Sequence, residues 1–189
     1  LTGLIVYQDY GLNIDDLYYR NNGDYFYNFV KEFLLGDILT SKFDFKKDIN
    51  IATPALYEII VSIICDILKI SDPKEIYEVS HLTNFSIFFL SLIFLYNIIL
   101  TRFKNKLLSI LSVLILFLSP RIFSESFYNS RDIFFLSMTV VSIFFVQNYF
   151  NKNSFKNLVY CSIFFAVLFS SRIFGIIPVL VLFILIFLM

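Results

Sequence analysis

Residues 85–100 read FSIFFLSLIFLYNIIL, a stretch without a single charge, and they decide the fold class. Further apolar runs follow, separated by short polar breaks, at residues 107–118, 133–146, 158–169 and 173–187. Runs of this kind form helices that enter a lipid bilayer when their ends extend into the breaks. The sequence therefore predicts an all-α protein in which residues 81–189 form a multi-pass transmembrane helical bundle of about five spans.

The composition also indicates a membrane protein. Hydrophobic residues make up 58% of the chain, the mean hydropathy is +0.77, and there are 25 Phe and no Trp. A soluble domain could not bury this much apolar surface in its core. We expect a multi-pass protein of the inner (plasma) membrane, in contact with membrane lipid. Because the chain starts without Met and ends inside an apolar run, we also expect a fragment truncated at the C-terminus.

Charge separates the chain into two parts. Residues 1–80 hold 13 of the 15 acids and 7 of the 15 bases, net −6, whereas residues 81–189 are net +6. Two breaks between apolar runs contain bases and no acid. One carries Arg102, Lys104 and Lys106, and the other carries Lys152 and Lys156. The positive-inside rule assigns such breaks to the cytoplasm. Counting spans from them predicts that residues 1–80, the loop 120–132 and Arg172 are extracytoplasmic.

The N-terminal part is predicted to be an extracytoplasmic loop with short and amphipathic interfacial helices. Asn13 or Asp15 can begin a short helix that Gly23 ends. After Thr53 and Pro54, a second helix has an apolar face and a polar stripe made of Glu58, Ser62, Asp66 and Lys69. It reaches only about 24 Å, which is too short for a span. We expect it to lie at the membrane interface with the polar stripe in water.

Acidic residues on this outer side are candidates for chemistry. A carboxylate that is partly desolvated near lipid headgroups has a raised pKa and can take a proton from a hydroxyl nucleophile. The adjacent Asp15 and Asp16 are therefore the candidate catalytic residues. The same pair also has a purely structural explanation, because acids at a helix N-terminus satisfy free amides and the helix dipole.

Arginines on the same side are candidates for binding phosphate, because a guanidinium group offers a planar fork of donors that stays charged. The candidate phosphate-binding residues are Arg131, Arg172 and Arg121. Supporting roles are assigned to Arg20, Glu58 and Asp132. The alternative for each arginine is a headgroup anchor. Since His81 is the only histidine, a multi-histidine metal site is excluded, and we assign no metal ligand or cofactor.

Three segments resemble one enzyme family. Residues 14–23, IDDLYYRNNG, are similar to the first extracytoplasmic loop of the polyprenyl-phosphate-sugar-dependent membrane glycosyltransferases of the C superfamily. Residues 53–58, TPALYE, resemble that family's Pro-Pro-Leu-Tyr segment, with Thr53 and Ala55 as departures. Residues 119–132, SPRIFSESFYNSRD, resemble an outer loop of its family 39 type branch. That group includes the protein O-mannosyltransferases and the aminoarabinose transferases.

The resemblance implies an N-terminal fragment of such an enzyme. It implies an inverting glycosyltransferase that moves a sugar from a polyprenyl-phosphate donor to a hydroxyl of a glycan, lipid or protein. The lipid-linked sugar is then a co-substrate, a divalent metal has no support in the sequence, and no nucleic acid partner is expected. Asp15 or Asp16 would be the base, and Arg131 or Arg172 would contact the phosphate.

Two other classes of protein remain open. A transporter or flippase-like bundle could line a substrate path with the same acids and arginines, and a nonenzymatic membrane assembly subunit would need none of them for chemistry. Transporters tend to carry charges near the middle of their spans. Here almost every charge after residue 80 lies in a break between apolar runs, which favours an interfacial site.

Overall fold

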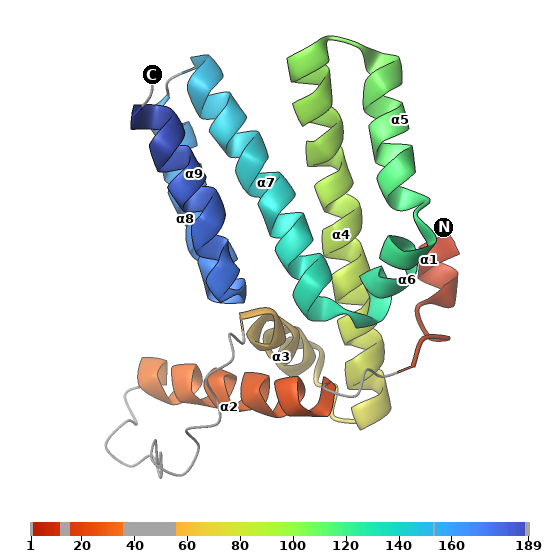
Figure 1. Ribbon diagram of the computed structural model, residues 1–189. Coiled ribbons are helices and arrows are strands. Elements are labelled where there is room, and N and C mark those ends of the chain that lie inside the picture. The colour runs from red at the N-terminus through yellow and green to blue at the C-terminus, as the bar shows by residue number, and fades with distance from the viewer. Residues whose placement is uncertain (1, 12–15, 36–55, 153, 188–189) are drawn as a thin grey trace.

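A computed structural model describes residues 2–11, 16–35, 56–152 and 154–187, and within these ranges the chain is helical and contains no strand (Figure 1). The all-α class is therefore confirmed. The elements are α1 (Thr2–Val6), α2 (Asp16–Leu35), α3 (Leu56–Leu68), α4 (Pro73–Phe103), α5 (Lys106–Phe117), α6 (Pro120–Tyr128), α7 (Ser130–Lys152), α8 (Phe155–Ser171), the short 3-10 helix η1 (Ile173–Gly175) and α9 (Ile176–Phe187).

Two of these helices, α4 and α7, are long and apolar enough to cross a membrane. A third span results if α5 and α6, which are bent by 62° relative to each other, count as one broken span. Helix α8 is apolar but shorter, since its 17 residues reach about 26 Å against a hydrocarbon core of about 30 Å. By length and composition, the described chain therefore has two to three candidate spans rather than the expected five.

The polar break after α4 is a tight turn between two helices. Lys104 has a left-handed backbone (φ 51°), and its N–H donates to the Leu100 carbonyl at 2.8 Å, which ends α4. Asn105 then caps α5, because its side chain accepts a hydrogen bond from the Leu108 N–H at 3.2 Å. The apolar chain thus reverses direction within a few residues.

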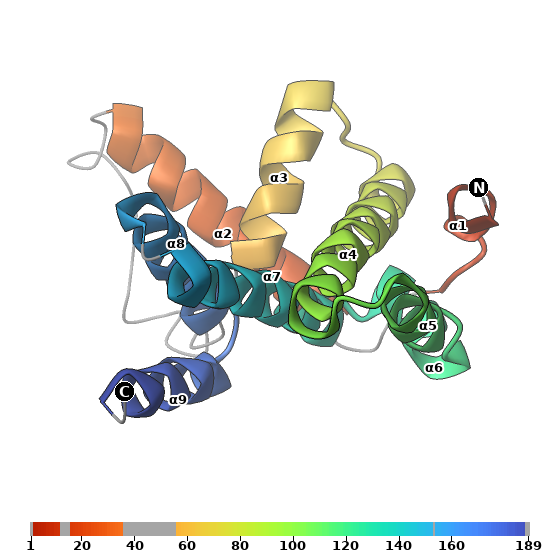
Figure 2. The same ribbon diagram turned by 90° about the horizontal axis from the view of Figure 1, so that it is seen from above.

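The helices form a group of roughly parallel rods with two more helices across one end (Figures 1 and 2). Helices α4, α5, α7, α8 and α9 make up the group, and α2 and α3 lie across the end at which α6 joins α7 (Figure 1). The turns α4–α5 and α7–α8, which carry the basic breaks, are at the opposite end (Figure 1). The acidic N-terminal helices and the basic turns are therefore separated by the length of α4 and α7.

Small and polar side chains fill much of the interior. Ser137 and Ser142 of α7 are buried, as are Ser91 and Asn84 of α4. Ser142 and Ser91 satisfy their hydroxyls locally, since Ser142 donates to the Met138 carbonyl and Ser91 to the Phe88 carbonyl, each at 2.7 Å. Among the described residues, the Ser137 hydroxyl and the Asn84 amide have no hydrogen-bond partner. By contrast, many large apolar side chains of α5, α8 and α9 are exposed. This distribution is typical of helices that pack closely against each other and face lipid.

The orientation of α3 differs from the expected one. Glu58 and Ser62 are buried against α2, whereas Ile63 and Ile67 of the apolar face are exposed. The expectation that the whole polar stripe faces water is therefore wrong for its N-terminal half. The physical reason is that α2 offers polar partners for this stripe, while α3 buries Tyr57, Val61 and Cys65 in the core and leaves only part of its apolar face exposed.

Gly23 was expected to end a helix, but it lies inside α2, at a point where α2 comes very close to α3. A Cβ atom at this position would come within 2.2 Å of the Glu58 Cβ. Glycine therefore permits α2 to pass directly over the first turns of α3. The contact positions the polar face of α2 above Glu58.

Candidate functional site

A cavity of ≈ 150 Å³ lies where α2 meets the α6–α7 junction and the end of α8. Eight residues line this cavity, which we call the polar cavity: Asp16, Tyr19, Tyr128, Asn129, Ser130, Arg131, Asp132 and Arg172. They come from three parts of the chain that are far apart in sequence. Asp16 therefore shares one cavity with Arg131 and Arg172, for which counting the spans predicted only a common membrane face.

The junction between α6 and α7 presents the central residues of the cavity. Asn129 breaks the helix, and its N–H still donates to the Glu125 carbonyl at 2.9 Å. The Asn129 side chain accepts from the Asp132 N–H at 3.2 Å and donates to the Asp132 carboxylate at 2.9 Å. This local capping holds Ser130, Arg131 and Asp132 in the first turn of α7.

Arg131 is held by an aromatic side chain from α2. Its Nη1 donates a hydrogen bond of 2.6 Å to the Tyr19 hydroxyl, and its Cζ lies 4.0 Å from the centroid of the Tyr19 ring. Among the described residues no carboxylate forms an ion pair with Arg131. Tyr19 thus orients the guanidinium group of Arg131 at the cavity wall, where the group can bind an anion.

Arg172 is held differently. It lies at the end of α8, where its N–H donates to the Leu168 carbonyl at 3.3 Å, and its side chain forms an ion pair with Asp132. Asp132, expected to have a supporting role, therefore orients Arg172. An anion that binds Arg172 must share this guanidinium with Asp132.

Asp16 is the first residue of α2 and lines the polar cavity. A carboxylate in this position is stabilised by the helix dipole, so the structural explanation and the cavity position apply to the same residue. Asp15 lies outside the described residues. Tyr19 follows Asp16 by three residues and lies on the same face of α2, a spacing by which sequence reasoning could have found it.

A third arginine of this region, Arg20, is buried. Arg20 is 8% exposed, and its Nη2 pairs with Asp24 Oδ1 at 2.5 Å. Asp24 also accepts a hydrogen bond of 2.9 Å from the Ser62 hydroxyl of α3. Arg20 thus connects α2 to α3 through Asp24 rather than lining the polar cavity, which is a supporting position.

Glu58 is the buried carboxyl of this region. It is 9% exposed, and among the described residues only the Ser130 hydroxyl donates a hydrogen bond to its carboxyl, at 3.2 Å to Oε1. Burial raises the pKa of Glu58 to about 7. The Ser130 hydrogen bond and the Arg20 charge oppose this rise, whereas the negative charges of Asp16 and Asp24 add to it. Glu58 can therefore exchange a proton near neutral pH.

Arg121 is not brought to the cavity. Its side chain is 86% exposed and pairs with Glu125, at 2.8 Å between Nε and Oε1, on the surface of α6. Of the three arginines predicted to bind phosphate, Arg131 and Arg172 line the polar cavity and Arg121 does not. The reason is that Arg121 lies on the outer surface of α6, whereas the break at Asn129 turns Arg131 toward the cavity.

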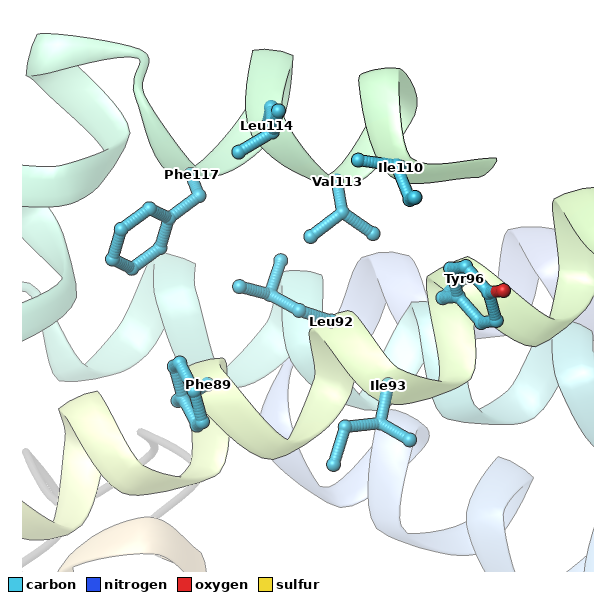
Figure 3. Close-up of a pocket in the computed structure, with 8 residues that line it drawn as sticks. All are labelled: Phe89, Leu92, Ile93, Tyr96, Ile110, Val113, Leu114 and Phe117. Atoms are coloured by element: carbon cyan, nitrogen blue, oxygen red, sulfur yellow. The ribbon is translucent and has the colours of Figure 1, made fainter. Parts of the chain in front are cut away.

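A cavity larger than the polar cavity is apolar. It has a volume of ≈ 490 Å³ and lies between α4 and α5 (Figure 3). Its lining residues are Phe89, Leu92, Ile93, Tyr96, Ile110, Val113, Leu114 and Phe117. Because this lining has almost no chemically active group, we place no reaction there. Within the described ranges, no three His, Cys, Asp or Glu side chains gather into a metal-binding group.

Comparisons of the chain with protein-family models, with curated proteins and with solved structures find no match. The residues of the polar cavity are therefore the basis on which we infer a function.

Proposed function

We propose that this chain belongs to an integral membrane glycosyltransferase that moves a sugar from a polyprenyl-phosphate donor to an acceptor hydroxyl on the extracytoplasmic side. The observation that carries the proposal is the polar cavity, in which Asp16 lies with Arg131 and Arg172 at the end of α7. A base for a hydroxyl and two cations for a phosphate are the groups that this transfer needs.

The topology of the proposal follows from charge. The turns α4–α5 and α7–α8 carry Arg102, Lys104, Lys152 and Lys156, and such turns stay in the cytoplasm by the positive-inside rule. In a multi-pass bundle of the inner membrane, the opposite end then faces outward. Helices α2 and α3 become interfacial helices of an extracytoplasmic loop, and the polar cavity opens toward the lipid-linked donor and the acceptor.

The reaction is a displacement at the anomeric carbon. Asp16 takes the proton from the acceptor hydroxyl, and the acceptor oxygen forms a bond to the anomeric carbon as the bond to the phosphate oxygen breaks. Arg131 contacts the departing polyprenyl phosphate, and Arg172 adds positive charge to the same cavity. Asp132 and Tyr19 keep these two guanidinium groups in place. Attack from the face opposite the phosphate inverts the anomeric configuration.

A transporter or flippase-like bundle is the main alternative, and a nonenzymatic assembly subunit is the other. In the two long helices α4 and α7, the acids, lysines and arginines lie near the ends, whereas transporters tend to carry charges near mid-span. This distribution favours chemistry at the interface over passage through the bundle.

The experiment that separates these functions follows both halves of the donor. Full-length protein in liposomes receives a polyprenyl-phosphate sugar labelled in the sugar, with glycan, lipid and protein acceptors added in turn. A transferase releases polyprenyl phosphate and gives a glycosylated acceptor with inverted anomeric configuration. Movement of intact donor across the bilayer would instead support a flippase. If the donor is neither consumed nor moved, the result would support an assembly subunit.

A further inference from the structure

A second, smaller chamber lies behind the polar cavity. Its volume is ≈ 10 Å³, about the smallest volume that holds one water molecule. It shares Asp16, Tyr128 and Ser130 with the polar cavity and reaches Glu58 on its inner side. We call it the inner chamber. Asp16 and Glu58 thus line the same water-sized space, and Asp16 alone of the two also lines the polar cavity.

Charged and titratable groups face Glu58 from every helix packed around it. These groups come from five helices. They are Asp16, Arg20 and Asp24 of α2, Tyr77 and His81 of α4, Tyr128 of α6, Arg131 of α7, and Tyr57, which precedes Glu58 on α3 itself. Among the described residues, Arg20 is paired with Asp24 rather than with Glu58. Within the described ranges, Glu58 therefore has a hydroxyl as hydrogen-bond donor but no ion pair. A buried carboxyl in these surroundings binds a proton readily.

His81 completes the wall of the inner chamber. Its Nδ1 lies 3.1 Å from the Tyr7 carbonyl oxygen, which can only accept, so Nδ1 carries the hydrogen. Its Nε2 is buried without a hydrogen-bond partner among the described residues. In the neutral tautomer Nε2 is an acceptor and can receive a hydrogen bond from a water molecule in the chamber.

We propose that Glu58 stores the proton that Asp16 takes from the acceptor hydroxyl, with one water molecule in the inner chamber carrying it between the two carboxyls. This inference rests on the proposed function, since it starts from Asp16 as the base. Glu58 acts through Asp16 and does not touch the sugar.

The transfer balances in two steps. First, the acceptor O–H bond breaks and an O–H bond forms on Asp16, while the electron pair of the breaking sugar–phosphate bond leaves on the phosphate. Next, Asp16 gives its proton to the chamber water, which passes one of its own protons to the Glu58 carboxylate. Asp16 is ionised again before the next acceptor binds. Because the pKa of Glu58 is raised to about 7, it accepts the proton and later releases it near neutral pH.

The first test measures the proton directly. Infrared spectra of the full-length protein in lipid nanodiscs, recorded from about pH 5 to pH 9, report the carbonyl stretch of protonated carboxylic acids. We expect a buried-acid band that disappears with a midpoint near 7, is absent in Glu58→Gln, and remains in Glu75→Gln, an exposed acid in the first turn of α4. A band that persists in Glu58→Gln would overturn the inference.

A second variant, Ser130→Ala, tests the same inference if Glu58→Gln fails to fold. Ser130→Ala removes the hydrogen bond that lowers the pKa of Glu58, so the band should titrate at higher pH than in the wild type. An unchanged midpoint would contradict the assignment of the band to Glu58.

The second test measures turnover. In Glu58→Gln we expect kcat to fall about tenfold or more, with an unchanged donor KM and without the inflection near neutral pH. An unaltered kcat profile would overturn the storage role while leaving the proposed function intact. A wild-type protein that binds the donor but never consumes it would instead overturn the proposed function, and the infrared titration would still report on Glu58.

Discussion

Arg131 of α7 lies over the ring of Tyr19 of α2, with its Cζ 4.0 Å from the ring centroid and its Nη1 2.6 Å from the Tyr19 hydroxyl. The contact joins residues 112 positions apart in the chain. It orients a guanidinium group without neutralising it, because the partner is aromatic and not acidic. A cation held in this way is suited to bind the phosphate of a donor.

Replacing Arg131 should weaken donor binding. Arg131→Gln removes a charge-assisted contact to phosphate, so we expect donor KM to rise about tenfold or more. The matched control is Arg121→Gln, which removes an arginine that is exposed and paired with Glu125 outside the polar cavity. Steady-state kinetics of both variants provide the measurement. Equal KM values for the two would show that Arg131 does not contact the donor.

Gly23 should be essential for the contact between α2 and α3. Alanine favours helices over glycine by about 1 kcal/mol, yet a Cβ at this position meets the Glu58 Cβ at 2.2 Å and the Glu58 backbone carbon at 3.1 Å. We expect Gly23→Ala to destabilise the protein by about 1–3 kcal/mol. The control is Asn28→Ala at an exposed position of α2, expected within about 0.5 kcal/mol of wild type. Thermal unfolding in detergent tests both, and a stabilised Gly23→Ala would refute the close approach.

Glu58 should make stability depend on pH. Its pKa is about 7 in the folded protein and about 4.3 in an unfolded chain, so the folded state binds the proton more tightly. The stabilisation is complete below about pH 4 and is lost as pH rises to about 7, with a total of about 4 kcal/mol.

Glu58→Gln stays neutral at every pH and should lack this dependence. Between about pH 5 and pH 8, the Tm of the wild type should fall relative to that of Glu58→Gln, whereas Glu75→Gln should follow the wild type. Parallel curves for wild type and Glu58→Gln would mean that Glu58 is ionised throughout.

The helical class could be predicted from sequence because the apolar runs are long and the breaks between them carry strong signals. Lys104 and Asn105 end one helix and begin the next as their polar break suggests. Counting spans from the basic breaks predicted only a common membrane face for Asp16 and Arg131, and the structure places both in the lining of one cavity. Of the five expected spans, α4 and α7 match by length and composition, α5 and α6 match only as one bent pair, and α8 is shorter.

The burial of Glu58 could not be predicted from the sequence of α3 alone. An amphipathic pattern identifies a polar face but not what covers it, and here the cover is α2, some 35 residues earlier in the chain. Tyr27 and Lys31 of α2 meet Asp66 of α3, just as Asp24 meets Ser62, so the polar stripe is a helix contact. Similarly, only the bend at Asn129 decides that Arg131 points inward and Arg121 outward.

The most direct measurement of the central claim is the rate at which full-length Asp16→Asn consumes a polyprenyl-phosphate sugar at saturating donor and acceptor. The account predicts a fall of about a hundredfold or more relative to the wild type, because the base is lost while Arg131 and Arg172 remain. The control, Asp9→Asn, changes an exposed acid of the same N-terminal part and should turn over normally. Wild-type turnover in Asp16→Asn would contradict the account.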